Sequence, residues 1–175
     1  LLLAETAFDT LVLKAALLAI EESFRSTGIV VPIMASFTVF EGGRTLSAQT
    51  VDACYQSISH ANLLSAGINC ALGPEKLRPY LADLSRICPR MVSCYPNAGL
   101  PNALGGFDET PDMMASVIGE FARDGFLNIV GGCCGTTPDH IRAIADEVSL
   151  HPPRRSPDQP RLSRYSGLEL LEVRP

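Results

Sequence analysis

Residues 126–139, with the sequence FLNIVGGCCGTTPD, contain a junction between a strand and a helix. The first five residues, 126–130, are typical of a short buried strand, and the Gly-Gly pair after them ends it. Residues 137–139 (Thr-Pro-Asp) then begin a helix, with Thr as the N-cap and Pro at the first helical position. Between the strand and the helix lie two adjacent cysteines, Cys133 and Cys134. The junction therefore places two thiols at the carboxyl end of a strand.

The same strand-to-helix pattern occurs five times along the chain. The short apolar runs that predict strands are residues 1–4, 30–35, 63–70, 91–95 and 126–130. Helices are predicted over residues 9–24 and from residues near 47, 73, 110 and 137. Strands that alternate with helices indicate a parallel sheet.

The spacing of the strand ends indicates how many such units the fold contains. The polar residues at the five predicted strand ends are Glu5, Ser36, Cys70, Asn97 and Cys133. Their average separation is 32 residues, so eight units make about 256 residues, close to the roughly 250 of a (β/α)8 TIM barrel. We therefore predict an α/β fold in which residues 1–150 form about the last five βα units of such a barrel. A doubly wound sheet is the alternative, although no Gly-x-Gly-x-x-Gly fingerprint follows any strand.

Composition excludes several classes of protein. The chain has 175 residues, of which 46% are hydrophobic, so it is not a disordered tail. Its net charge of −5 gives no sign of a nucleic-acid partner, and no apolar run reaches the roughly 18 residues of a membrane span. The chain begins with LLLA rather than Met, so we expect a piece of a longer protein that lacks roughly 80 residues of the barrel. Alone, such a piece is expected to be poorly soluble or inactive.

The composition changes from residue 151 onward. Residues 151–164 contain four Pro and four Arg and have no apolar period, which predicts an extended linker over residues 151–175 rather than a packed element. Arg154 and Arg155 can be interpreted as a patch for nucleic acid or membrane, but two adjacent charges beside prolines are more typical of solvated side chains. The stretch 167–173 is too short to assign.

Six cysteines suggest metal binding or catalysis rather than disulfides. A secreted disulfide scaffold is usually shorter and denser in cysteine, so we expect a reducing, cytoplasmic setting. Cys54, Cys88 and Cys94 are interpreted as small core residues.

The other three cysteines lie at strand ends, where the active site of a barrel is found. Thiolates from Cys70, Cys133 and Cys134 would hold Zn2+ with one tetrahedral position open, as in catalytic zinc sites. Such a centre is suited to holding a substrate thiol as a reactive thiolate, which is the chemistry of alkyl transfer to sulfur. A redox or structural role for the vicinal pair Cys133–Cys134 remains the alternative.

Three motifs together resemble one family. They are GINCALGP at residues 67–74, YPNAGLPN at residues 95–102 and NIVGGCCGTTP at residues 128–138. The sequence is similar to zinc-dependent homocysteine S-methyltransferases, and most of all to the homocysteine-binding domain of cobalamin-dependent methionine synthases. The resemblance covers residues 1–148, and SGLE at residues 166–169 resembles the run toward the folate-binding domain of those enzymes.

The resemblance implies a role for each site residue. Cys70, Cys133 and Cys134 would hold the zinc and act catalytically through it, with Asn97 beside the metal as a fourth ligand until homocysteine displaces it. Glu5 would bind the amino group of homocysteine, although an exposed acid without a role is the alternative. Asn69 would orient the site or shape the strand end. Ser36 would line the same face, but Phe37 replaces a residue that is more often Gly in the family.

The implied reaction is methyl transfer to the thiol of homocysteine, which forms methionine. Methylcobalamin is the implied donor, and other domains of the full enzyme would bind it and methyltetrahydrofolate. A betaine- or S-methylmethionine-dependent enzyme is the alternative within the family.

Overall fold

The computed structural model describes residues 1–158 and 162–174. Its elements, in chain order, are β1 (Leu2–Ala7), α1 (Thr10–Thr27), β2 (Ile33–Phe37), α2 (Val51–Ile58), β3 (Ser65–Asn69), α3 (Pro74–Ile87), β4 (Met91–Tyr95), α4 (Pro111–Arg123), β5 (Ile129–Val130), α5 (Pro138–Val148), β6 (Ser163–Ser166) and β7 (Leu170–Val173). The five predicted strand–helix units are all confirmed, and β6 and β7 form an additional hairpin.

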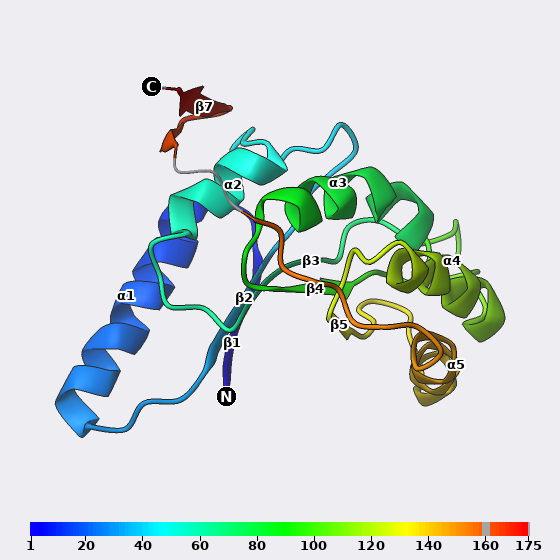
Figure 1. Ribbon diagram of the computed structural model, residues 1–175. Helices are drawn as coiled ribbons and strands as arrows, with labels where there is room; N and C mark the ends of the chain where they lie inside the picture. The colour runs from blue at the N-terminus through cyan, green and yellow to red at the C-terminus, as the bar shows by residue number, and fades with distance from the viewer. Residues whose placement is uncertain (159–161, 175) are drawn as a thin grey trace.

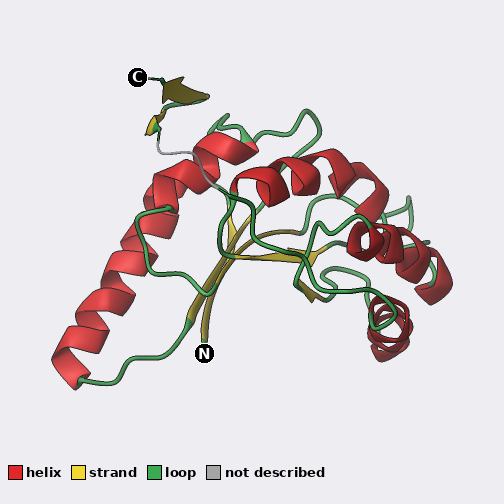
Figure 2. Cartoon of the chain, in the orientation of Figure 1, coloured by secondary structure: helices red, strands yellow, loops and turns green. Residues whose placement is uncertain are grey.

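Strands β1 to β5 form one parallel sheet in sequential order. Helices α1 to α5 lie in an arc around one side of this curved sheet, and none covers the other side (Figures 1 and 2). A doubly wound sheet has helices on both faces, so the arrangement confirms the α/β prediction and agrees with part of a TIM barrel.

Alternation along the strands separates the two faces of the sheet. Phe37, Ile68 and Cys94 are fully buried in the main hydrophobic core, together with apolar residues of the helices. Because side chains alternate along a strand, Ser36 and Asn69 point to the opposite face. In a barrel that face is the interior, and its carboxyl end carries the active site.

The predicted helix starts are correct except for one. Pro74, Pro111 and Pro138 each stand at the start of a helix, because a missing N–H costs nothing there. The helix expected from near Ser47 begins instead at Val51. Residues 44–50 form a closed turn in which the N–H of Thr45 donates to the carbonyl of Gln49, so the chain cannot enter the helix earlier.

The segment after α5 is more ordered than an extended linker. The interpretation of Arg154 as a solvated charge is wrong, because it is 5% exposed and its guanidinium donates to carbonyls at and just after the end of α3. Arg155 is exposed, as expected. The β6–β7 hairpin packs on α2, where the Ser166 hydroxyl donates to the Ala53 carbonyl. Residues 159–161 of the predicted linker, and residue 175, lie outside the described residues.

Candidate metal centre

Cys70 follows the last residue of β3 in an unusual backbone conformation. Its φ is +64° and that of Ala71 is +59°, in the left-handed region that costs a non-glycine residue about 1 kcal/mol or more. Two hydrogen bonds hold this turn: the Cys70 N–H donates to the Tyr95 carbonyl at 3.0 Å, and the Leu72 N–H donates to the Cys70 carbonyl at 2.7 Å. The strained backbone conformation of Cys70 is therefore held by one hydrogen bond to the neighbouring strand β4 and one within the turn.

Cys133 and Cys134 lie in the loop that follows β5. The Cys133 N–H donates to the Pro96 carbonyl at 2.8 Å, and the Ala98 N–H donates to the Cys134 carbonyl at 2.9 Å. Thr136 closes the loop, because its hydroxyl donates to the Cys133 carbonyl at 2.7 Å. The loops after β4 and β5 are thus joined to each other beside the cysteines.

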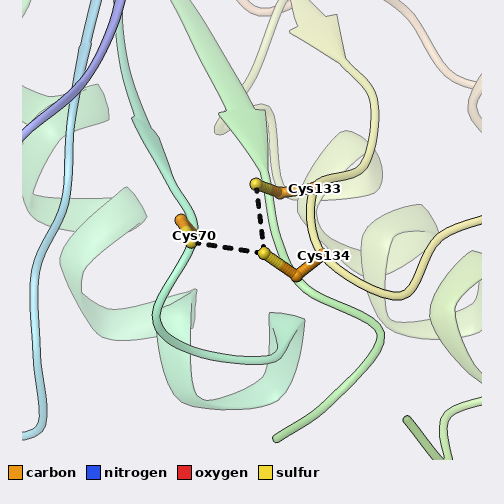
Figure 3. A group of neighbouring side chains, drawn as sticks. All are labelled: Cys70, Cys133 and Cys134. Carbon is orange, nitrogen blue, oxygen red and sulfur yellow. Dashed lines mark hydrogen bonds between the residues drawn. The ribbon is translucent and has the colours of Figure 1, made fainter. Parts of the chain in front are cut away.

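The three thiols meet in one cluster, as the sequence predicts (Figure 3). The Cys70 and Cys134 sulfurs are 3.7 Å apart, and those of Cys133 and Cys134 are 3.9 Å apart. All three sulfurs lie within 4.8 Å of one another. Tetrahedral coordination with Zn–S bonds of about 2.3 Å places sulfurs about 3.8 Å apart, so the donor set fits a zinc ion.

The environment of the cluster disfavours thiolates in the absence of a cation. Burial, followed by the proximity of Cys70, raises the pKa of the Cys133 thiol to about 12. Burial and Cys70 likewise raise the pKa of Cys134. Without a cation the Cys133 and Cys134 thiols therefore stay protonated at neutral pH, and a divalent cation would be needed to hold them as adjacent thiolates.

The other three cysteines are core residues, as predicted. Cys54, Cys88 and Cys94 are each fully buried. Burial raises the pKa of both Cys54 and Cys94 to about 12, which is typical of an unreactive thiol.

The chain from residue 1 to residue 148 matches the family model for homocysteine S-methyltransferase. This match covers most of the chain and includes the whole thiol cluster. The chain belongs to the homocysteine S-methyltransferase family.

A solved structure supports the fold of this homocysteine S-methyltransferase domain. The apo homocysteine methyltransferase MmuM from Escherichia coli matches with a TM-score of 0.54 and 24% sequence identity. The alignment covers 84% of this chain and 49% of that one, so the chain spans about half the length of MmuM. No helix in the described part of the chain is long and apolar enough to cross a membrane.

Two predicted substrate residues of this methyltransferase domain, Asn97 and Glu5, differ in their surroundings. Asn97 lies beside the thiol cluster, and Glu5 is open to solvent. Asn97 is buried, and its side-chain carbonyl accepts a hydrogen bond from the Cys134 N–H at 3.1 Å. Glu5 is exposed on β1. Its charge adds to the effect of burial, which raises the pKa of Tyr95. A ligand role for Asn97 and a substrate contact for Glu5 remain predictions.

The other two predicted substrate residues, Ser36 and Asn69, are fully buried and bond to each other. The Ser36 hydroxyl donates to Asn69 Oδ1 at 2.8 Å, and the Thr6 N–H donates to the same oxygen at 3.2 Å. Asn69 Nδ2 donates in turn to Thr6 Oγ1 at 2.7 Å. This network joins the ends of β1, β2 and β3.

Sequence reasoning assigned no role in the site to Thr6 or Thr136. Thr136 stands three residues after Cys133, a spacing typical of a hydroxyl that caps a tight turn, so the sequence did contain a signal for it. Thr6 carried no such signal, because its bonds depend on a side chain 63 residues away.

Proposed function

We propose that this chain takes part in zinc-dependent methyl transfer to the thiol of homocysteine, forming methionine. The observation that carries the proposal is the set of three sulfurs, from the ends of β3 and β5, that lie within 4.8 Å of one another in a chain of this family. Three thiolates at this spacing match both the tetrahedral geometry of zinc and its preference for soft sulfur ligands.

Cys70, Cys133 and Cys134 would hold the metal. A bound zinc ion would lower the pKa of the homocysteine thiol and so supply a thiolate at neutral pH. Asn97 lies against Cys134 and is placed to keep this loop fixed while the thiol binds. Glu5, exposed on the first strand, would accept hydrogen bonds from the amino group of homocysteine. In the overall reaction the thiol loses its proton, and the sulfur gains the methyl group that the donor gives up.

For the methyl donor we propose methylcobalamin, as in cobalamin-dependent methionine synthases. The support is the sequence resemblance at residues 95–102 and 126–130. On this proposal other domains would bind methylcobalamin and methyltetrahydrofolate, and residues 151–175 would lead toward the folate-binding domain. Betaine and S-methylmethionine are the alternative donors.

A redox pair is the alternative of another class. Cys133 and Cys134 are adjacent, their sulfurs are 3.9 Å apart, and Cys134 is exposed. A redox pair changes its number of free thiols with reductant, whereas a zinc site changes it with chelator.

The test uses the full-length protein purified under reducing conditions. We expect one zinc per barrel, and methionine formation from homocysteine with methylcobalamin but not with betaine or S-methylmethionine. Cys133→Ala should lose both the zinc and the reaction. Cys94→Ala is the matched control: it removes a buried thiol of the adjacent strand and should keep the zinc. Retention of stoichiometric zinc and homocysteine binding in Cys133→Ala would refute the assignment.

A further inference from the structure

We propose that Asn69 is a positioning residue that fixes Glu5 and Cys70 relative to each other. It thereby sets the spacing between the amino-group site and the thiol site for homocysteine. The inference rests on the proposed function and goes beyond it, because it assigns selectivity for the amino acid to a residue that has no exposed surface.

The backbone that carries Glu5 is irregular near the end of β1. The parallel pairing of β1 with β2 shifts register between Ala4 and Ala7. At this bulge Thr6 takes a φ of +59°, a conformation costly for a β-branched residue. Bulges commonly redirect a side chain beside an active site. The bulge therefore determines where the neighbouring Glu5 carboxylate points.

Asn69 holds this bulge with a two-point clamp. The Thr6 N–H donates to Asn69 Oδ1, and Asn69 Nδ2 donates to Thr6 Oγ1. Ser36 adds a third hydrogen bond to Oδ1 and fixes the amide plane from β2. Because both ends of the amide are used, rotation of the side chain breaks bonds on two strands at once. The strained turn at Thr6 is thus stabilised by a side chain of β3.

The clamp is directly connected to Cys70, one of the proposed metal ligands. Cys70 is the next residue after Asn69, and it begins the left-handed turn that directs its thiol toward Cys134. The backbone of Asn69 has little freedom, since β3 pairs with β2 on one side and β4 on the other. One residue therefore joins the bulge that carries Glu5 to the turn that carries Cys70.

The chemistry of the substrate gives this link a purpose. Homocysteine offers a thiol and an amino group at a separation limited by its short chain. A site that binds both groups must keep Glu5 and the thiol cluster at a matching distance. Preorganised spacing of this kind favours the ligand that makes both contacts over one that makes only the thiol contact.

The experiment compares two thiols on the full-length protein loaded with Co2+ in place of zinc. Homocysteine carries the amino group, and 4-mercaptobutyrate lacks it but is otherwise the same. The Co2+ absorption bands report thiolate coordination independently of turnover. Dissociation constants for both thiols are measured by titration, and their ratio is the selectivity for the amino group.

We expect the parent protein to prefer homocysteine, and Asn69→Ala to reduce that preference at least tenfold and to shift the Co2+ bands. Thr6→Ala removes one arm of the clamp at a partly buried position, so it should reduce the preference by a smaller factor, about threefold. If Asn69→Ala does not fold, the ratio measured for Thr6→Ala tests the positioning role of Asn69 instead.

Asn128→Ala is the matched control. Asn128 also bridges two segments through its amide, accepting from the Val92 N–H and donating to the Arg154 carbonyl. Its loss should lower stability without changing the ratio or the bands.

The outcomes separate this inference from the proposed function. Glu5→Gln should remove the preference and leave the Co2+ bands unchanged. If Glu5→Gln removes it while folded Asn69→Ala and Thr6→Ala keep the parent ratio and bands, the positioning role is overturned and the proposed function stands. If Glu5→Gln keeps the preference, Glu5 does not bind the amino group, so the positioning inference is overturned while zinc-dependent methyl transfer stands. If the parent binds neither Co2+ nor homocysteine, both proposals fail together.

Discussion

The side-chain carbonyl of Asn97 accepts a hydrogen bond from the backbone N–H of Cys134 at 3.1 Å. Asn97 is only 4% exposed, so little water can replace it as the acceptor. The bond joins the loop after β4 to the loop that carries two of the three clustered thiols. Asn97 therefore shapes the thiol cluster through the backbone, whether or not it also contacts a metal.

Asn97→Ala is expected to weaken metal binding roughly tenfold or more, a loss typical of residues that orient metal ligands. The Cys134 N–H would lose its acceptor, and the loop would keep only its backbone hydrogen bonds to β4 and the loop after it. Asn97→Asp keeps the accepting oxygen and should retain most of the affinity. Competition with a chromophoric chelator measures both variants. An unchanged affinity in Asn97→Ala would show that the loop holds its shape without this bond.

Glu109 is a partly buried acid whose environment disfavours its charge. Its carboxylate lies so close to Gly73 that a Cβ added there would be 2.7 Å from Oε1. Burial raises the pKa of Glu109 above the usual 4.5, Glu75 adds to the rise, and His140 opposes it. The native state thus holds the Glu109 proton more tightly than the unfolded chain does.

Glu109→Gln is expected to change how stability depends on pH. In the parent, the stability associated with Glu109 is fully present below a pH of about 4.5, because the carboxyl group is then protonated in both states. It is lost as pH rises through the raised native pKa. The Gln variant lacks this loss, so its stability relative to the parent should increase as the pH rises from about 4.5 toward neutrality. Urea unfolding at several pH values measures the difference, and a constant difference would contradict the assignment.

Arg154 ties the segment after α5 to the end of α3. Its Nε donates to Ser85 Oγ at 2.8 Å, its Nη2 donates to the Ser85 carbonyl at 2.6 Å, and its Nη1 donates to the Arg90 carbonyl at 3.0 Å. Nη2 also donates to the Cys88 carbonyl. A cation at the carboxyl end of a helix is further stabilised by the helix dipole.

Arg154→Ala is expected to lower the free energy of unfolding by about 2–4 kcal/mol, because it removes the donor to the carbonyls of two buried residues, Ser85 and Cys88. The neighbouring Arg155 is exposed, so Arg155→Ala should change stability by no more than about 0.5 kcal/mol. Urea denaturation of both variants makes the comparison. Equal stabilities would mean that water replaces the guanidinium at no cost.

Local chemistry explains which features the sequence could predict. A Pro after a capping Thr is a local signal for the start of a helix, so the start of α4 could be located from three residues. The thiol cluster could be anticipated because parallel strands bring their carboxyl ends to one edge. The burial of Arg154 could not, since its acceptors are carbonyls more than 60 residues away in the chain. The late start of α2 depends on Ala48, which takes a φ of +65° inside a closed turn.

Gly135, directly after the cysteine pair, has a φ of +80°, and a Cβ added to it would lie 2.3 Å from Cγ of Phe107. Gly125, in the turn after α4, has a similar φ of +70°, but a Cβ there would meet nothing within 4 Å. The two glycines share the backbone requirement and differ in the space around them. A comparison of the two therefore separates conformational strain from displacement of the loop.

Both alanine variants should lose about 1–2 kcal/mol of stability from the left-handed conformation alone. Gly135→Ala must in addition move Phe107 or the loop that carries Cys133 and Cys134, so we expect it to lose further stability and to bind metal at least tenfold more weakly. Gly125→Ala should keep the metal affinity of the parent. Urea unfolding and chelator competition on the same two proteins measure both effects. Equal metal affinity in the two variants would mean that Phe107 yields to the added methyl group and that the cysteine loop does not depend on this contact.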